Sequence, residues 1–190
     1  MAVFDGHRPA YIPIVRFTIA LYDTAPGAVA SVAYSALSLC YIAIPMSLLQ
    51  LVYDMSYDYS IILMLFVMIW VNDTGAYCVG CSIGRRRLFE RLSPKKSWEG
   101  FWGGLIASIL VGVVAHLCFP DRWSLGGWIG FGALVSIVAT FGDLFESMIK
   151  RTAGVKDSGQ LIPGHGGMLD RIDSLLFVAP VAACYAIIMS

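Results

Sequence analysis

The amino-acid sequence predicts an all-α fold: a polytopic integral membrane protein with about five transmembrane helices and a short N-terminal interfacial segment. Of its 190 residues, 58% are hydrophobic and 14% are charged, whereas a soluble domain is about half apolar and about a quarter charged. The mean hydropathy is +0.73. Five stretches have the roughly 20 mainly apolar residues that a spanning helix needs. The formal net charge is zero, so no overall field favours a nucleic-acid partner.

The predicted spans follow one another along the chain with polar connectors between them. They cover 28–51, 60–81, 101–119, 126–148 and 172–189. A sixth apolar stretch, 10–22, is too short to cross a bilayer and is interrupted by Pro13 and Arg16. We therefore predict that it lies at the membrane interface or is partly buried.

Basic residues gather in two of the connectors, which predicts how the spans are oriented. The first basic loop contains Arg85, Arg86, Arg87, Arg91, Lys95 and Lys96. The second contains Lys150, Arg151, Lys156 and Arg171. Lys and Arg are enriched in cytoplasmic loops, and two spans separate these loops, so both are predicted to face the cytoplasm. For the three arginines at 85–87, a purely topogenic role and a functional role stay open.

Polar residues also occur inside two predicted spans, where ionisable groups are costly and point to function. In the fourth span a polar stripe at helical spacing, with Glu146 beside it, consists of Ser136, Thr140, Asp143, Ser147 and Lys150. Helix packing explains the hydroxyl groups but not two carboxylates three residues apart. In the second span, Asn72 and Asp73 mark either an interfacial helix end or a polar site within the membrane.

The two basic loops contain residues suited to phosphate and metal binding. Pro94 is predicted to fix a turn, and Lys95 and Lys96 follow it as candidate phosphate contacts, with a helix start at Ser97. Glycines around position 165 let the backbone approach an anion. Asp170 and Asp173 at the start of the fifth span offer the oxygen ligands that Mg²⁺ prefers. These residues predict a membrane enzyme that handles phosphate esters at the cytoplasmic face.

The run at 147–173, SMIKRTAGVKDSGQLIPGHGGMLDRID, resembles the signature of phosphatidate cytidylyltransferases (CDP-diacylglycerol synthases) at every defined position. Blocks at 70–77, 93–100 and 142–147 resemble that family in the same order. Cys81 stands where a basic residue is expected. Family members usually carry several additional N-terminal spanning helices, so we expect a short form or fragment that lacks them. We divide the chain into an N-terminal apolar segment with the first span, 1–59, and a catalytic membrane domain, 60–190.

The resemblance implies transfer of a cytidylyl group from CTP to phosphatidic acid, which gives CDP-diacylglycerol and pyrophosphate. It implies Mg²⁺, with K⁺ as a possible second, monovalent cation. The positions that match the family's paired metal site are Asp143 and Asp170. Glu146 and Asp173 are further candidate metal ligands, or carboxylates beside the ligands, because each lies one helical turn from one of these two. The catalytic residues would be Asp143, Asp170, Lys150, Arg171 and His165. The substrate-binding residues would be Asn72, Asp73, Lys95, Lys96, Arg151, Lys156, Gly166 and Gly167.

Several alternatives stay open. His165 is either a general base or a ring that orients the loop and contacts phosphate. A CTP-dependent kinase of the polyprenol or phytol type would share the general features, and a non-enzymatic transporter or scaffold would use the carboxylates as an ion path. The resemblance further implies a homodimer in the bacterial inner membrane or an equivalent membrane, with the active site facing the cytoplasm.

Overall fold

The computed structural model describes residue 18, the ranges 27–56, 59–155 and 169–189, and the single residues 158 and 167. The chain divides into two units, residues 1–44 and 45–190. In the first unit, α2 (Ala28–Ser38) leads into a π-helix, η1 (Leu39–Ala43). Apart from Thr18, which is helical, the predicted interfacial segment 10–22 lies outside the described residues.

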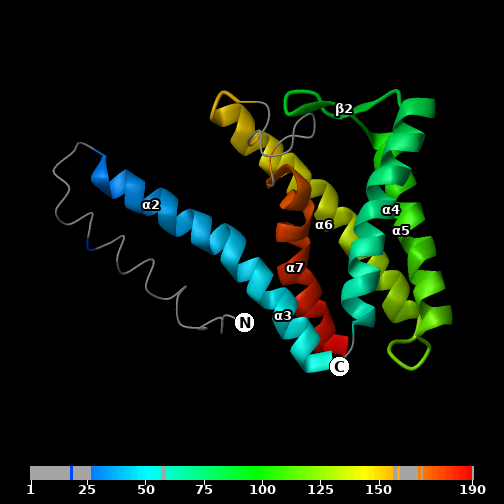
Figure 1. Cartoon of the computed structure of the whole chain (residues 1–190). Helices are drawn as coiled ribbons and strands as arrows, with labels where there is room; N and C mark the ends of the chain where they lie inside the picture. Colours follow the sequence, from blue (N-terminus) through cyan, green and yellow to red (C-terminus); the bar gives the residue numbers. More distant parts are fainter. Residues whose placement is uncertain are drawn as a thin grey trace. The chain divides into compact units, whose positions relative to one another are not determined.

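The second unit is a group of antiparallel helices with one short hairpin (Figure 1). Its first helix is α3 (Ile44–Ser56), which begins at the last residue of the first unit. The elements that follow are α4 (Ser60–Ile83), β1 (Arg87–Phe89), β2 (Ser93–Ser97), α5 (Trp98–Cys118), α6 (Leu125–Thr152) and α7 (Leu169–Met189). Within the described part of the chain, five helical segments are long and apolar enough to cross a membrane: Val29–Asp54, Ser60–Ile83, Trp98–Cys118, Leu125–Thr152 and Leu169–Met189. The predicted all-α membrane fold with five spans is therefore confirmed. The functional boundary that we place at residue 60 stays a prediction.

Each of the five spans has at least one end that differs from the prediction, by one to four residues, and two of these differences have local reasons. Helix α5 begins at Trp98, three residues before the predicted 101, because the Ser97 side chain caps it and accepts a hydrogen bond from the Gly100 amide at 3.1 Å. Helix α6 continues to Thr152 instead of 148 and has Lys150 and Arg151 in its last turn. Cations are favourable at that end of a helix dipole. The extension brings Lys150 into the helix that carries Asp143.

The hairpin between α4 and α5 corrects one expectation. Strands β1 and β2 pair antiparallel, with Arg87 opposite Ser97 and Phe89 opposite Ser93. Pro94 therefore lies in β2 and does not fix a turn. Proline is tolerated because both strands of a two-stranded sheet are edge strands, so its missing N–H interrupts no central ladder.

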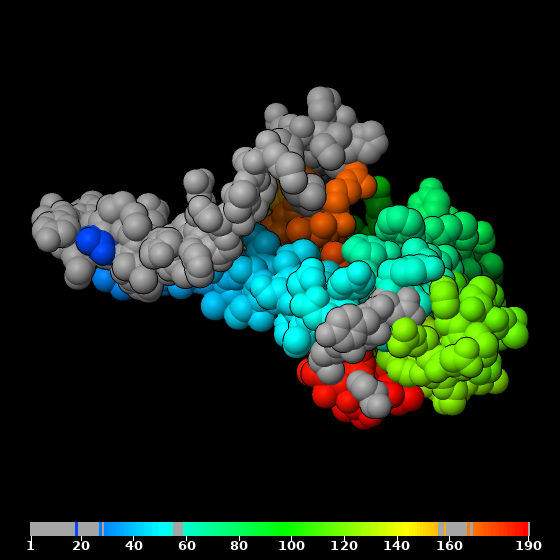
Figure 2. Space-filling view, turned by 60° about the horizontal axis from the view of Figure 1, so that its bottom comes forward, coloured from blue at the N-terminus to red at the C-terminus, as the bar shows by residue number. Residues whose placement is uncertain are grey.

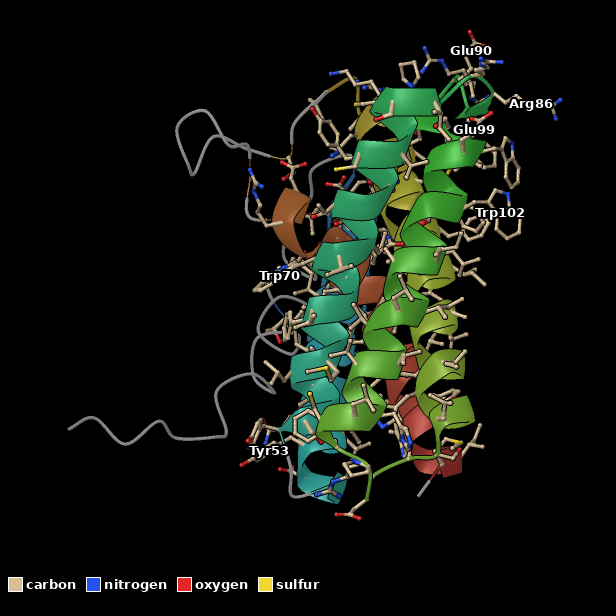
Figure 3. The ribbon with its side chains drawn as sticks, turned by 90° about the vertical axis from the view of Figure 1, so that its right-hand side faces the viewer. Tyr53, Trp70, Arg86, Glu90, Glu99 and Trp102 are labelled. Atoms are coloured by element: carbon tan, nitrogen blue, oxygen red, sulfur yellow. The ribbon has the colours of Figure 1, made fainter. Side chains whose placement is uncertain are left out.

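One side chain fastens this hairpin to the start of α5. The Glu99 carboxylate accepts hydrogen bonds from the backbone amides of Arg85 at 3.1 Å and Arg86 at 3.2 Å. The Trp98 amide in turn donates to the Arg86 carbonyl at 2.9 Å. Figure 3 shows Arg86, Glu90 and Glu99 together at one end of α4 and α5. The hairpin is thus held over that end of the helices.

Glycines allow α4, α5 and α6 to pack with their backbones close together. A Cβ atom at Gly75 would lie 2.9 Å from the Ala107 side chain across the α4–α5 contact. At Gly112 and Gly132 it would lie 2.5 Å from backbone carbonyl oxygens of Trp128 and Ser108, respectively. Small residues of this kind are what close contact between membrane helices requires. The three helices therefore have little freedom to shift against one another.

Opposite ends of the unit have different chemistry. The hairpin, the end of α6 and the start of α7 lie at one end, and the α5–α6 connection and the C-terminus lie at the other (Figure 1). Figure 2 shows the second end, where the C-terminal residues of α7 lie beside the α5–α6 connection. The second end is closed by aromatic packing of Trp123 against Trp128, Phe131 and Tyr185. The Tyr185 hydroxyl also donates to the Gly127 carbonyl at 2.7 Å. The charged residues of interest lie at the first end.

Candidate active site

Three carboxylates from two helices meet near the hairpin end. Asp143 and Glu146 come from α6 and Asp173 from α7, and one ligand oxygen of each lies within 4.8 Å of the others. The helices approach closely at Gly142, where a Cβ atom would lie 2.9 Å from the Phe177 Cβ atom. The glycine beside Asp143 therefore lets α7 bring Asp173 within reach of the α6 carboxylates.

These residues fit a divalent cation such as Mg²⁺. Glu146 is fully buried, and its Oε1 atom has no hydrogen-bond partner among the described residues. Buried carboxylate oxygens normally have a partner, so an unpaired one is consistent with a bound ion. Three hard oxygen donors at this spacing are the ligand type that Mg²⁺ takes, with water or substrate completing its shell.

Asp170, the fourth predicted metal ligand, is outside this group of three. Its Oδ1 atom lies 2.7 Å from the Lys150 Nζ atom, and Lys150 also contacts Glu146. Its Oδ2 atom accepts hydrogen bonds from the Ser158 amide at 3.0 Å and hydroxyl at 2.8 Å, and from the Gly167 amide at 2.8 Å. Lys150 thus connects Asp170 to the three carboxylates. The metal-binding role of Asp170 stays a prediction.

Next to the three carboxylates lies a cavity of about 220 Å³. It is lined by Asp73, Ala76, Tyr77, Leu88, Lys95, Lys96, Ser97, Phe101, Thr140 and Asp143. The Lys96 Nζ atom lies 2.5 Å from Asp143 Oδ2, which connects β2 to α6. Three predicted substrate contacts, Asp73, Lys95 and Lys96, are therefore brought together beside a predicted metal ligand.

The remaining predicted site residues are placed as follows. Asn72 is buried and does not line this cavity, although its neighbour Asp73 does. Arg151 and Arg171 are exposed, and neither is among the described residues that line it. Lys156, His165 and Gly166 lie outside the described residues. The predicted roles of all these residues stay predictions.

Two aromatic side chains line the cavity without having been named as site residues. Tyr77 follows Asp73 by four residues on α4, and Phe101 follows Ser97 by four residues. Residues four apart on a helix share a face, so helical spacing from Asp73 was a sufficient signal for Tyr77. Phe101 could be placed only once the start of α5 was fixed at Trp98.

The fold and these groups define a class of protein: a helical membrane protein with lysines and several carboxylates at one end of its spans. The chain belongs to the cytidylyltransferase family, whose sequence profile it matches over residues 5–189. The match covers far more than half of the chain, so it includes both basic loops and all the carboxylates described above.

Curated relatives named phosphatidate cytidylyltransferase are similar over the larger part of this chain. The protein of Synechocystis sp. is 50% identical over 126 residues, which is 65% of this chain and 42% of the relative. The Thermotoga maritima protein is 47% identical over 63% of this chain and 46% of the relative. The Haemophilus influenzae protein is 42% identical over 67% of this chain and 46% of the relative. The chain thus spans less than half the length of these relatives.

Proposed function

We propose that this membrane protein transfers the cytidylyl group of CTP to phosphatidic acid and so forms CDP-diacylglycerol and pyrophosphate. The observation that carries the proposal is the cavity in which Lys95 and Lys96 lie beside Asp143, itself one of three clustered carboxylates. Phosphoryl-type transfer needs cations that neutralise phosphate oxygens and a fixed geometry. The relatives' shared name supports the choice of substrates.

In this reaction a phosphate oxygen of phosphatidic acid attacks the α-phosphorus of CTP, and the bond to the pyrophosphate oxygen breaks. Asp143, Glu146 and Asp173 would hold Mg²⁺, which supplies charge neutralisation at the phosphates when bound. Lys95 and Lys96 would contact the triphosphate as compact cations. Phosphatidic acid is already an anion near pH 7, so His165 is proposed to orient phosphate and not to remove a proton.

Two further features belong to the proposal. The hairpin end of the spans would face the cytoplasm, which the concentration of basic residues in both loops at that end supports. The protein would also act as a homodimer and use K⁺ beside Mg²⁺, as the family resemblance implies. Cross-linking of the purified protein in lipid nanodiscs tests the dimer, and turnover in Na⁺ against K⁺ buffers tests the second cation.

The decisive experiment uses the purified chain in nanodiscs with phosphatidic acid, Mg²⁺ and CTP that is labelled at either the α- or the γ-phosphate. We expect α-label in the lipid product and γ-label in pyrophosphate. Transfer of γ-label to a lipid alcohol would indicate a kinase instead, and no transfer from either position would contradict an enzymatic role for this chain. A chelator should stop the reaction and added Mg²⁺ should restore it.

Variants locate the reaction in the described site. Asp143→Asn and Asp173→Asn should each lower turnover at least 100-fold, because each removes a charged ligand oxygen from the group of three. Asp121→Asn is the matched control, since Asp121 is exposed in the α5–α6 connection at the other end of the spans. Full turnover by both site variants would refute the assignment.

A further inference from the structure

Asn72 differs from every other predicted substrate contact that the structure describes on α4 and β2, because it is enclosed by protein. Its side chain is 2% exposed, whereas the neighbouring Asp73 is exposed and lines the cavity. One residue along a helix turns the side chain by about 100°. Asn72 therefore points between the helices while Asp73 points into the cavity.

A hydrogen bond across the membrane helices holds the Asn72 amide. The Ser136 hydroxyl of α6 donates to Asn72 Oδ1 at 2.6 Å, and Ser136 is completely buried. The Ser136 carbonyl accepts a hydrogen bond from the Thr140 hydroxyl at 2.9 Å, and Thr140 lines the cavity. A buried polar group within a membrane span needs such a partner because no water replaces it. The bond therefore joins α4 to α6 at the level of Asn72 and Ser136 along the helix axes.

Helix α5 leaves space for this bond. A Cβ atom at Gly104 would lie 2.6 Å from Asn72 Oδ1 and 2.8 Å from the Asn72 carbonyl oxygen. Any larger residue at position 104 would displace the amide. Three helices thus enclose the Asn72 side chain, and the contact of its Nδ2 atom with Asp73 Oδ1, at 3.4 Å, leads toward the cavity.

The bond is close in sequence to both carboxylates of the cavity. Asn72 precedes Asp73 directly, and Ser136 lies seven residues, or two helical turns, before Asp143 on the same face of α6. We propose that Asn72 is a positioning residue: bonded to Ser136, it fixes α4 against α6 so that Asp73 and Asp143 face one cavity, and it does not contact substrate. The proposal rests on the proposed function for its kinetic test.

The kinetic test compares Asn72→Ala, Ser136→Ala and the double variant in the CTP and phosphatidic acid assay. We expect kcat to fall about 10- to 100-fold in each, the range that displacement of reacting groups by up to 1 Å produces. The KM values for both substrates should stay within about twofold of wild type. The double variant should be no slower than the slower single variant, because one interaction is lost in all three.

Ser108→Ala is the matched control. Ser108 is also fully buried, and its hydroxyl also donates across two helices, from α5 to the Met68 carbonyl of α4 at 3.2 Å, but it does not line the cavity. It should lower the thermal midpoint about as much as Ser136→Ala and leave kcat within about twofold. Any of three results would overturn the proposal. These are a raised KM in Asn72→Ala, a fall in kcat in the double variant equal to the two single falls combined, and a fall in kcat in Ser108→Ala as large as that in Ser136→Ala.

A second measurement needs no turnover and separates this proposal from the proposed function. The five cysteines, all exposed, are replaced by alanine, and Asp73→Cys and Asp143→Cys are introduced for a short bifunctional thiol reagent. Adding Ser136→Ala should lower the rate of cross-linking between positions 73 and 143 at least threefold, because the bond that fixes α4 against α6 is lost. Adding Ser108→Ala should leave that rate unchanged. Unchanged cross-linking with Ser136→Ala would overturn the positioning role even if the wild-type chain turns over CTP. Slower cross-linking with Ser136→Ala would support that role even if the wild-type chain shows no turnover and the proposed function fails.

Discussion

A single methyl group added at Gly142 should lower turnover strongly while lowering the stability of the fold only slightly. A Cβ atom there would lie 2.9 Å from Phe177 Cβ and 3.3 Å from Ser174 Cα. Carbon atoms pack at about 3.5–4.0 Å, so α6 and α7 must part by roughly 0.5–1 Å to accept Gly142→Ala. That movement separates Asp143 from Asp173, which come from opposite sides of this contact.

The expected effects differ in size. Misplacement of reacting groups by 1 Å costs about 100-fold in rate, so we expect turnover to fall about 10- to 100-fold. Overpacking costs about 1–3 kcal/mol, while alanine gains about 1 kcal/mol over glycine in a helix, so stability should fall by about 2 kcal/mol at most.

The assay is transfer of label from α-labelled CTP into the lipid product, beside thermal unfolding in the same nanodiscs. Gly126→Ala serves as the control, because the nearest atom to its added Cβ is Ser124 Oγ at 3.9 Å and the site lies at the other end of α6. Wild-type turnover in Gly142→Ala would show that the close approach of α6 and α7 does not set the distance between the carboxylates.

Three further predictions concern other parts of the molecule. Lys96→Gln should lower turnover at least tenfold, because Lys96 lies 2.5 Å from Asp143 in the cavity, while Arg122→Gln in the α5–α6 connection should not. Glu99→Gln should speed proteolysis of the hairpin, because it weakens the acceptor for the backbone amides of Arg85 and Arg86. Glu90→Gln in the same hairpin is the control, and equal rates of cleavage in the two variants would contradict the role of Glu99. Tyr185→Phe should cost about 0.5–1.5 kcal/mol in unfolding free energy through loss of its hydrogen bond, with turnover unchanged.

The sequence predicts the membrane fold well because each span depends on local composition. Its limits are visible at the hairpin, where Pro94 and two lysines show none of the alternation that predicts a strand. The pairing of Arg87 with Ser97 depends on a contact between distant residues and on Glu99 beyond them. No local pattern contains that information.

The candidate site shows the same division between local and distant information. Helical spacing places Asp143 and Glu146 on one side of α6, so their proximity could be predicted. The position of Asn72 could not, because its partner Ser136 lies 64 residues away and its enclosure depends on a glycine of a third helix. Sequence reasoning identifies which residues are unusual, and packing decides which of them reach the cavity.

The attachment of the hairpin has a consequence for how the bilayer acts on the protein. Chain connections join the hairpin to α4 and α5, and Glu99 binds it to the first turn of α5, so Lys96 follows any change in the tilt of these helices. Spanning helices change tilt when the hydrocarbon thickness changes. Close packing at Gly75, Gly112 and Gly132 holds α4, α5 and α6 together, so we expect these helices to tilt as one group. The distance between Lys96 and Asp143 would then stay the same in membranes of different thickness, and turnover should change little as the acyl chains of the surrounding lipid are lengthened.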